Sequence, residues 1–158
     1  MTDPKPARTD ADLRRKLAEF SVPSEPGNER LAMETVAETA KNLGFSGENL
    51  ERLKTAVAEA TMNAMEHGNH YKPEVPVELQ VLVTQEDLLV RITDRGSGPP
   101  PREDGDTPDL EAKLEGIQTP RGWGLFLIKS MVDEMNITGD EGHHTVELVV
   151  HLGAEGGK

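Results

Sequence analysis

The chain has 158 residues, a length typical of one domain with a hydrophobic core of its own. Its 17 basic and 29 acidic side chains give a net charge of -12, and it has one Trp, one Tyr and three Phe, which together argue against duplex binding and against base stacking on single strands. The absence of cysteine excludes disulfides, thiolate catalysis and zinc–sulfur sites.

The two ends of the chain are expected to be tails around one domain. Residues 1–13 are polar and contain no apolar stretch of signal-peptide length. No run in the chain approaches the roughly 20 apolar residues of a membrane span. We therefore expect a cytoplasmic protein that binds neither membrane nor nucleic acid, with one domain over residues 14–152 and a short tail over 153–158.

The first half of the domain predicts a strand followed by two helices. Residues 14–22 alternate weakly and predict the strand. A first helix can begin at Pro26, because apolar residues recur after it at helical spacing. Ser46 is typical of an N-cap, and the helix after it is expected to run to about His67 and to stop at Gly68.

The second half predicts two strand pairs, a long loop and a third helix. The loop covers about residues 96–121 and is rich in Pro, Gly and acids, which is typical of a lid. The third helix should begin near Gly122. Its apolar face is predicted to carry Leu125, Ile128, Met131, Val132 and Met135. Strands are expected at 75–85, 87–94, 136–140 and 144–152.

This order of elements predicts the fold class. A strand, two helices, a hairpin, a loop, a helix and a second hairpin are typical of an α+β protein. We expect a two-layer α/β sandwich with a mixed, mostly antiparallel sheet covered on one face by three helices. No internal repeat and no second domain are visible in the sequence.

The sequence EATMNAMEHGN, residues 59–69, places polar side chains on an apolar helix. Glu59 and Asn63 are four residues apart, so their side chains lie on the same side of the helix. A buried carboxylate without compensation costs several kcal/mol, so a divalent metal, a substrate hydroxyl or a neighbouring cation should accompany Glu59. The alternative is a surface ion pair of Glu59 with Arg52 or Lys54.

A second motif, ITDRGSG, ends a predicted strand. Asp94 is followed by Gly96 and Gly98, which would let a flat ring approach the backbone while the carboxylate accepts from an exocyclic amine. A plain glycine-rich turn is the alternative.

A third motif, TPRGWG, begins the third predicted helix. Arg121 precedes Gly122 and Gly124, and exposed helix amides beside a cation form a phosphate seat, although many helices begin in this way. Neither a P-loop nor the dinucleotide-binding glycine pattern is present. His67 fits the capping of carbonyls at a helix end better than the role of a ligand.

Together, EATMNAMEHGN, DRGSGP and RGWGLFLIKSMVDEM resemble the N, G1 and G2 boxes of the GHKL (Bergerat-fold, HATPase) ATP-binding superfamily. Over residues 14–152 the chain resembles the RsbW-like branch, the bacterial anti-sigma-factor serine kinases. Sensor histidine kinases share the boxes, but they usually lack a glutamate four residues before the asparagine. They also need a histidine on an upstream helical hairpin, whereas all five histidines here lie at or after residue 67.

The resemblance implies ATP and Mg²⁺ as cofactors and assigns a role to each motif. Asn63 would hold the Mg²⁺ that bridges the ATP phosphates, and Glu59 would be the general base for a serine hydroxyl. Asp94 would accept from the adenine amine, with Gly96 and Gly98 shaping the ring pocket. The further nucleotide contacts that the resemblance implies are His67, Arg121, Gly122, Trp123, Gly124 and Leu125.

The resemblance also implies a regulatory function. Such a kinase phosphorylates a STAS-domain antagonist on Ser or Thr and sequesters a sigma factor or another regulator, so it acts by partner switching in transcription regulation and stress response. The family often forms homodimers, which we expect here. The alternative is a nucleotide-dependent binding switch without significant kinase activity. Glu59 favours the kinase, because a binding module needs Asn63 and Asp94 but no base.

Overall fold

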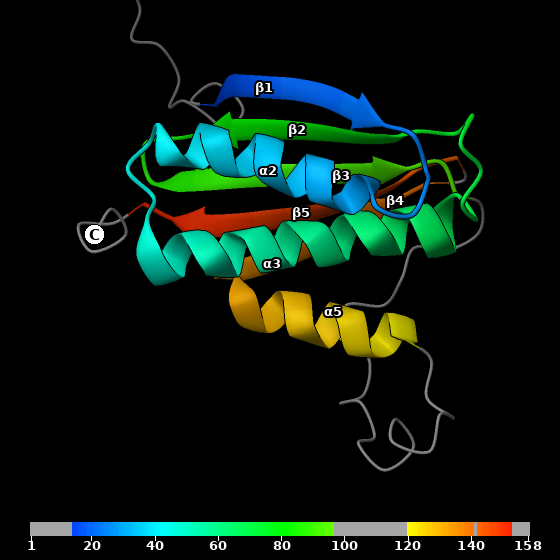
Figure 1. The fold of residues 1–158 in the computed structure, drawn as a ribbon. Helices are drawn as coiled ribbons and strands as arrows, with labels where there is room; N and C mark the ends of the chain where they lie inside the picture. The colour runs from blue at the N-terminus through cyan, green and yellow to red at the C-terminus, as the bar shows by residue number, and fades with distance from the viewer. Residues whose placement is uncertain (1–13, 97–119, 141, 153–158) are drawn as a thin grey trace, which may run out of the picture.

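The computed structural model describes residues 14–96, 120–140 and 142–152. The helices of this part lie together on one face of a single sheet (Figure 1). In chain order the elements are β1 (Arg15–Val22), α2 (Asn28–Lys41), α3 (Gly47–Asn63), the π-helical turn η1 (Ala64–Gly68), β2 (Val77–Val83), β3 (Asp87–Asp94), α5 (Pro120–Met131), β4 (Glu134–Gly139) and β5 (His144–His151).

The sheet has five described strands in the order β1-β2-β3-β5-β4. Each neighbouring pair is antiparallel, so the sheet we expected to be mixed is antiparallel throughout its described strands. The α+β fold and the two-layer sandwich are confirmed. No helix in the described ranges is both long and apolar enough to cross a membrane.

The core lies between the sheet and the helices because the strands alternate with period two. On α3, Leu53, Val57 and Ala60 recur at helical spacing and are buried against this inner face. The buried strand residues on the same side are Val77, Leu79, Val81, Leu88, Val90, Ile92 and Leu148. The intervening strand positions form the outer face, where Arg91 Nε donates to Glu147 Oε2 at 2.8 Å.

The long helix ends in a wider turn than the sequence predicts. It begins after Ser46 as expected, although the Ser46 side chain makes no capping hydrogen bond. After Asn63 the helix continues as η1, and the N–H of Asn69 donates to the carbonyl of Ala64, five residues earlier, at 2.9 Å. The π-helical turn thus carries the chain through His67 to Gly68.

The third helix ends earlier than its apolar spacing predicts. It stops at Met131, and the N–H of Asp133 already donates to the carbonyl of Val149 at 3.0 Å, which joins the chain to the sheet. Met135 therefore lies on β4, where its side chain is buried. Its spacing of four residues from Met131 does not reflect a continuing helix. The lid predicted at 96–121 lies outside the described residues, apart from its ends at Gly96 and at the start of α5.

Candidate active site

Glu59 and Asn63 lie on the side of α3 that packs against α5. A Cβ on Gly124 of α5 would lie 2.5 Å from Glu59 Oε2 and 2.9 Å from Asn63 Nδ2. Side chains do not come that close without something moving, so glycine is what allows α5 to lie against both residues. The structure thus brings together three residues that the sequence separates by up to 65 positions in two different motifs.

Asn63 is buried, with 8% of its surface exposed. Its Nδ2 is fully buried and has no hydrogen-bond partner within the described ranges. A buried polar atom without a partner costs free energy, and a bound ligand would remove that cost. The amide oxygen and nitrogen are assigned from the same surroundings, so either can face a ligand.

The residues fit a magnesium ion that is shared with a nucleotide. The Asn63 amide offers an oxygen ligand, which Mg²⁺ prefers. Within the described part of the chain, no group of three or more His, Cys, Asp or Glu could hold a metal ion. Mg²⁺ is usually held by one or two side chains, with substrate phosphates and waters completing the octahedron.

The cations that could have paired with Glu59 each have another partner. Lys54 Nζ lies 3.5 Å from Glu51 Oε2, and Arg52 donates to the carbonyl of Ser130 at 3.2 Å. Glu59 itself is partly buried on the face toward α5. The geometry therefore places Glu59 at the α3–α5 contact.

Asp94 ends β3 in a corner made by two glycines. A Cβ on Gly68 would lie 2.7 Å from the Cβ of Asp94 and closer still to its carboxyl carbon. The N–H of Gly96 donates to Asp94 Oδ1 at 2.7 Å. Glycine at both positions lets η1 and the chain after β3 pack onto the carboxylate, and Gly96 therefore lies beside Asp94.

The structure adds His144, which the sequence analysis did not select. His144 faces Asp94 across the β3–β5 ladder, and its Nδ1 lies 3.3 Å from Asp94 Oδ1. The side chains are only 4% and 7% exposed. The antiparallel pairing of 87–94 with 144–152 was the one signal that could have indicated this contact, since it puts the start of one strand opposite the end of the other.

Asn69 is a second residue that the sequence analysis passed over. Its Oδ1 accepts from the N–H of Arg95 at 2.8 Å. Its Nδ2 lies within hydrogen-bonding distance of Ser24 Oγ, the carbonyl of Val75 and the carbonyl of Pro76. The buried amide therefore ties η1 to the chain directly after Asp94. Its place in the EHGN sequence after the predicted helix was the available signal.

A narrow hollow is lined by both Asn63 and Asp94. Its free space is ≈ 10 Å³, about the volume that one water molecule needs. Its walls are mainly apolar, with Asn63 and Asp94 among the lining residues. This space is too small for a nucleotide, so nucleotide binding requires the walls of the hollow to rearrange. The lining consists of Ala60, Asn63, Ala64, Asp94, Leu125, Ile128 and Val146.

Two larger hollows, each ≈ 320 Å³, lie on the outer face of the sheet. Their lining is mostly polar and includes none of the predicted site residues. We therefore place the site at the α3–α5 contact, where the predicted residues converge, despite its smaller free space.

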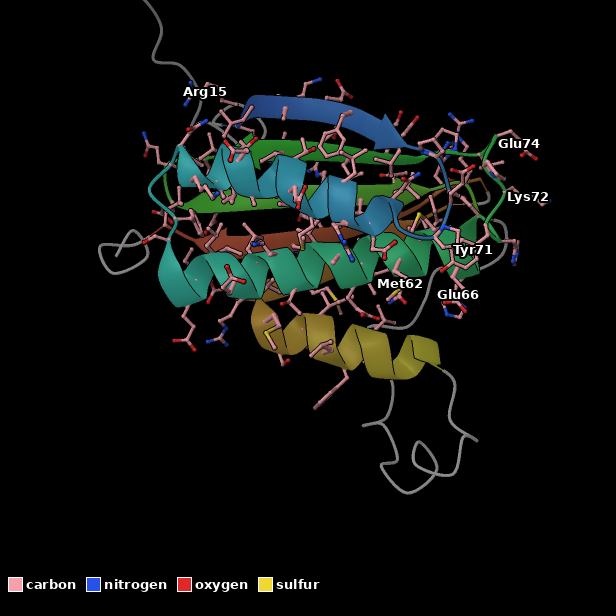
Figure 2. All side chains as sticks on the ribbon, viewed as in Figure 1. Arg15, Met62, Glu66, Tyr71, Lys72 and Glu74 are labelled. Atoms are coloured by element: carbon pink, nitrogen blue, oxygen red, sulfur yellow. The ribbon has the colours of Figure 1, made fainter. Side chains whose placement is uncertain are left out.

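The remaining predicted residues are less closely defined. His67 lies on η1, with its Nε2 3.8 Å from Glu66 Oε1, and Leu125 is buried in the wall of the hollow. Figure 2 shows Glu66 and Tyr71 near the end of the long helix. Arg121, Gly122 and Trp123 belong to the start of α5, but their side chains and Gly98 lie outside what the structure describes.

Comparison with known proteins gives a consistent picture. The family described as "Histidine kinase-like ATPase domain" matches residues 22–150. The chain is 33% identical to an anti-sigma F factor of Anoxybacillus flavithermus, covering 85% of this chain and 90% of that protein. It is 30% identical to the serine-protein kinase RsbW of Oceanobacillus iheyensis, covering 78% and 80%.

Solved structures show the same fold at lower identity. One chain of the SiaB–SiaC complex from Pseudomonas aeruginosa is similar with a TM-score of 0.61 at 15% identity, covering 86% of this chain and 90% of that one. A structure of RsbU and RsbW domains from Mycobacterium tuberculosis has a TM-score of 0.58 at 16% identity, covering 85% of this chain and 32% of that longer one.

Proposed function

The chain belongs to the histidine kinase-like ATPase family, in its RsbW-like branch, and we propose that it transfers the γ-phosphoryl group of ATP to a serine or threonine of a partner protein. The observation that carries this proposal is the convergence of Glu59 and Asn63 on Gly124 at the α3–α5 contact. A module that only binds a nucleotide would need Asn63 and Asp94. Phosphotransfer also requires a base, and Glu59, one turn before Asn63, would provide it.

Phosphoryl transfer depends mainly on positioning and on the neutralisation of charge. Asn63 would hold a Mg²⁺ ion, which supplies the charge that neutralises the phosphates when it is bound. The start of α5 adds backbone amides and the positive end of a helix dipole. Because Gly124 carries no side chain, these amides can come close to the same place as the Asn63 amide.

Glu59 would act as the general base. A base must lie within hydrogen-bonding reach of the proton that it removes, and its side chain points to the α3–α5 contact rather than to bulk solvent. An incoming serine or threonine hydroxyl would donate to the Glu59 carboxylate, which holds the proton as the hydroxyl oxygen attacks phosphorus. Asn63, one turn further along α3, keeps the phosphate beside this base.

Asp94 would select the base of the nucleotide. Its carboxylate lies in a buried corner of the hollow that Asn63 also lines, and the apolar walls there suit an aromatic ring. Binding would require the walls of the hollow to rearrange, since the present space is too small for a base. Leu125 and Ile128 of α5 belong to these walls, so the packing of α5 would respond to the nucleotide.

The partner is proposed to be a STAS-domain antagonist, with a sigma factor or another regulator as the protein that is held and released, in the cytoplasm and from a homodimer. The names of the relatives, serine-protein kinase RsbW and anti-sigma F factor, support this assignment. The acidic charge of -12 also fits a protein partner better than nucleic acid.

Incubation with γ-labelled ATP and a candidate STAS domain tests the proposal. We expect Mg²⁺-dependent transfer of the label to a single serine or threonine, and none when that residue is replaced by alanine. If ATP binds but no STAS domain of the organism accepts label, the chain is a nucleotide-dependent binding switch and the kinase proposal is wrong.

A further inference from the structure

Strands β3 and β5 carry an aspartate–histidine pair at each end of their shared ladder. Asp87 is the register partner of His151, and Asp94 is the register partner of His144. The first pair is on the surface, with its side chains 27% and 54% exposed and an Oδ1–Nδ1 distance of 2.7 Å. The second is almost fully buried at 3.3 Å. The chain therefore repeats one pairing in two very different environments.

The two pairs differ in what they can contribute to stability. A surface pair costs little to form and contributes little to stability. A buried pair loses the hydration of both partners, so it is weak evidence for stability alone. The buried pair lies at the hollow that Asp94 lines, which points to a role in ligand recognition.

The contacts of Asp94 show what His144 can do there. A carboxylate rotates easily about its terminal torsion, because that torsion has broad wells. Here the N–H of Gly96 and the imidazole of His144 both lie at Oδ1, while the backbone of Gly68 closes the side next to the carboxyl carbon. The hydrogen bond from Gly96 and the His144 ring at 3.3 Å from the same oxygen limit the rotation, so the other oxygen takes a defined direction.

We propose that His144 is a positioning residue that holds the Asp94 carboxylate in the orientation that selects a nucleobase bearing an exocyclic amine. The inference rests on the proposed nucleotide-binding function and deepens it. An amine donates to the carboxylate, whereas a keto oxygen at the same position would face its lone pairs. A site built around one hydrogen bond discriminates strongly against an analogue that cannot make it.

The test compares the dissociation constants of ATP and inosine triphosphate, which carries a keto oxygen in place of the amine. We expect the wild type to bind ATP at least about tenfold more tightly, which corresponds to about 1.4 kcal/mol. His144→Ala should lose most of this ratio by weakening ATP alone. His144→Asn should restore it, since its amide nitrogen takes a place close to that of Nδ1.

His151→Ala is the matched control, because it removes the same kind of pair from the same ladder at the end away from the hollow. It should keep the ATP-to-inosine ratio of the wild type. Thermal unfolding of each variant with and without nucleotide reports whether the fold survives.

Two results would overturn the inference and leave the proposed function intact. One is a His144→Ala protein with an unchanged ratio, while Asp94→Asn loses it. The other is an equal loss of affinity for both nucleotides in His144→Ala and His144→Asn, which would make His144 purely structural. A wild type that binds neither nucleotide would instead contradict the proposed function itself, and the inference with it.

Discussion

The packing around Asp94 depends on residues that have no side chain. Gly68 has no side chain, and a Cβ there would meet the Asp94 side chain at 2.7 Å or less. The obstructing atoms belong to a short, buried side chain and not to the end of a flexible one. A substitution at this position therefore cannot be absorbed by a simple rotation.

We predict that Gly68→Ala lowers the free energy of unfolding by about 1–3 kcal/mol, the usual cost of overpacking. It should also weaken ATP binding, because the Asp94 carboxylate must move. Chemical denaturation and calorimetry measure the two effects. Gly142→Ala is the control, since a Cβ at Gly142 meets nothing within 4 Å. Equal stability of the two variants would show that the corner is looser than described.

At the scale of residues, the sequence predicts the side chains that would carry the chemistry better than it predicts the side chains that support them. Glu59, Asn63 and Asp94 stand out because each places a polar group in an apolar or glycine-rich setting. His144 and Asn69 do not, since their significance depends on strand register and on the closure of a turn. The one-turn spacing of Glu59 and Asn63 is local, whereas the His144–Asp94 contact joins residues 50 positions apart.

At the scale of elements, the site is a contact between two helices. The long helix supplies Glu59 and Asn63, and α5 covers them through Gly124. Leu125 and Ile128 of α5 are buried behind this contact. The helix is therefore held by apolar packing while its start carries the groups predicted to contact phosphate.

We predict that Gly124→Ala impairs phosphotransfer much more than stability. Its Cβ would meet the end of the Glu59 side chain at 2.5 Å, and a flexible carboxylate can turn away at a cost of under about 1 kcal/mol. That movement displaces the base, and a misplacement of about 1 Å can reduce a rate about 10²-fold. Single-turnover transfer and thermal unfolding are the two measurements.

The same Gly142→Ala protein serves as the control for this pair of measurements. If Gly124→Ala transferred phosphate at the wild-type rate, Glu59 would not need its present position. The assignment of Glu59 to the α3–α5 contact would then be wrong.

The boundaries of the elements show where sequence patterns fail. Apolar spacing predicted that Met135 continues the third helix, because 131 and 135 are four apart. Hydrogen bonding to β5 decides otherwise, and that strand lies further along the chain. In the same way a π-helical turn at Ala64–Gly68 has no simple periodic signature, since it depends on how the chain leaves the helix.

At the scale of the whole molecule, the order of elements was sufficient to predict the architecture. Two hairpins, two adjacent helices and a later third helix leave few ways to bury every apolar face, and the two-layer sandwich is one of them. In the strand order β1-β2-β3-β5-β4, the last strand β5 inserts between β3 and β4, so that β5 and not β4 lies next to β3. That crossover, which puts His144 beside Asp94, follows from tertiary packing and has no local signal.

At the scale of the whole molecule, the candidate site lies where α3 and α5 meet the sheet. The hollow there is lined by residues of both helices and of β3 and β5, and it admits only about one water molecule. Nucleotide binding would therefore change the packing around this hollow. A partner that contacts α5, which lies beside α3 (Figure 1), could distinguish the nucleotide-bound form.

The central claim is that Glu59 is a base and Asn63 a metal ligand, and one paired measurement tests it: the ATP dissociation constant and the single-turnover transfer rate with Mg²⁺. Glu59→Gln should keep the wild-type affinity and lose about 10²-fold or more in rate. Asn63→Ala should bind Mg²⁺–ATP more weakly. Glu66→Gln, at a half-exposed neighbour on η1 (Figure 2), should change neither. Equal losses of ATP affinity in Glu59→Gln and Asn63→Ala, or full transfer by Glu59→Gln, would contradict the account.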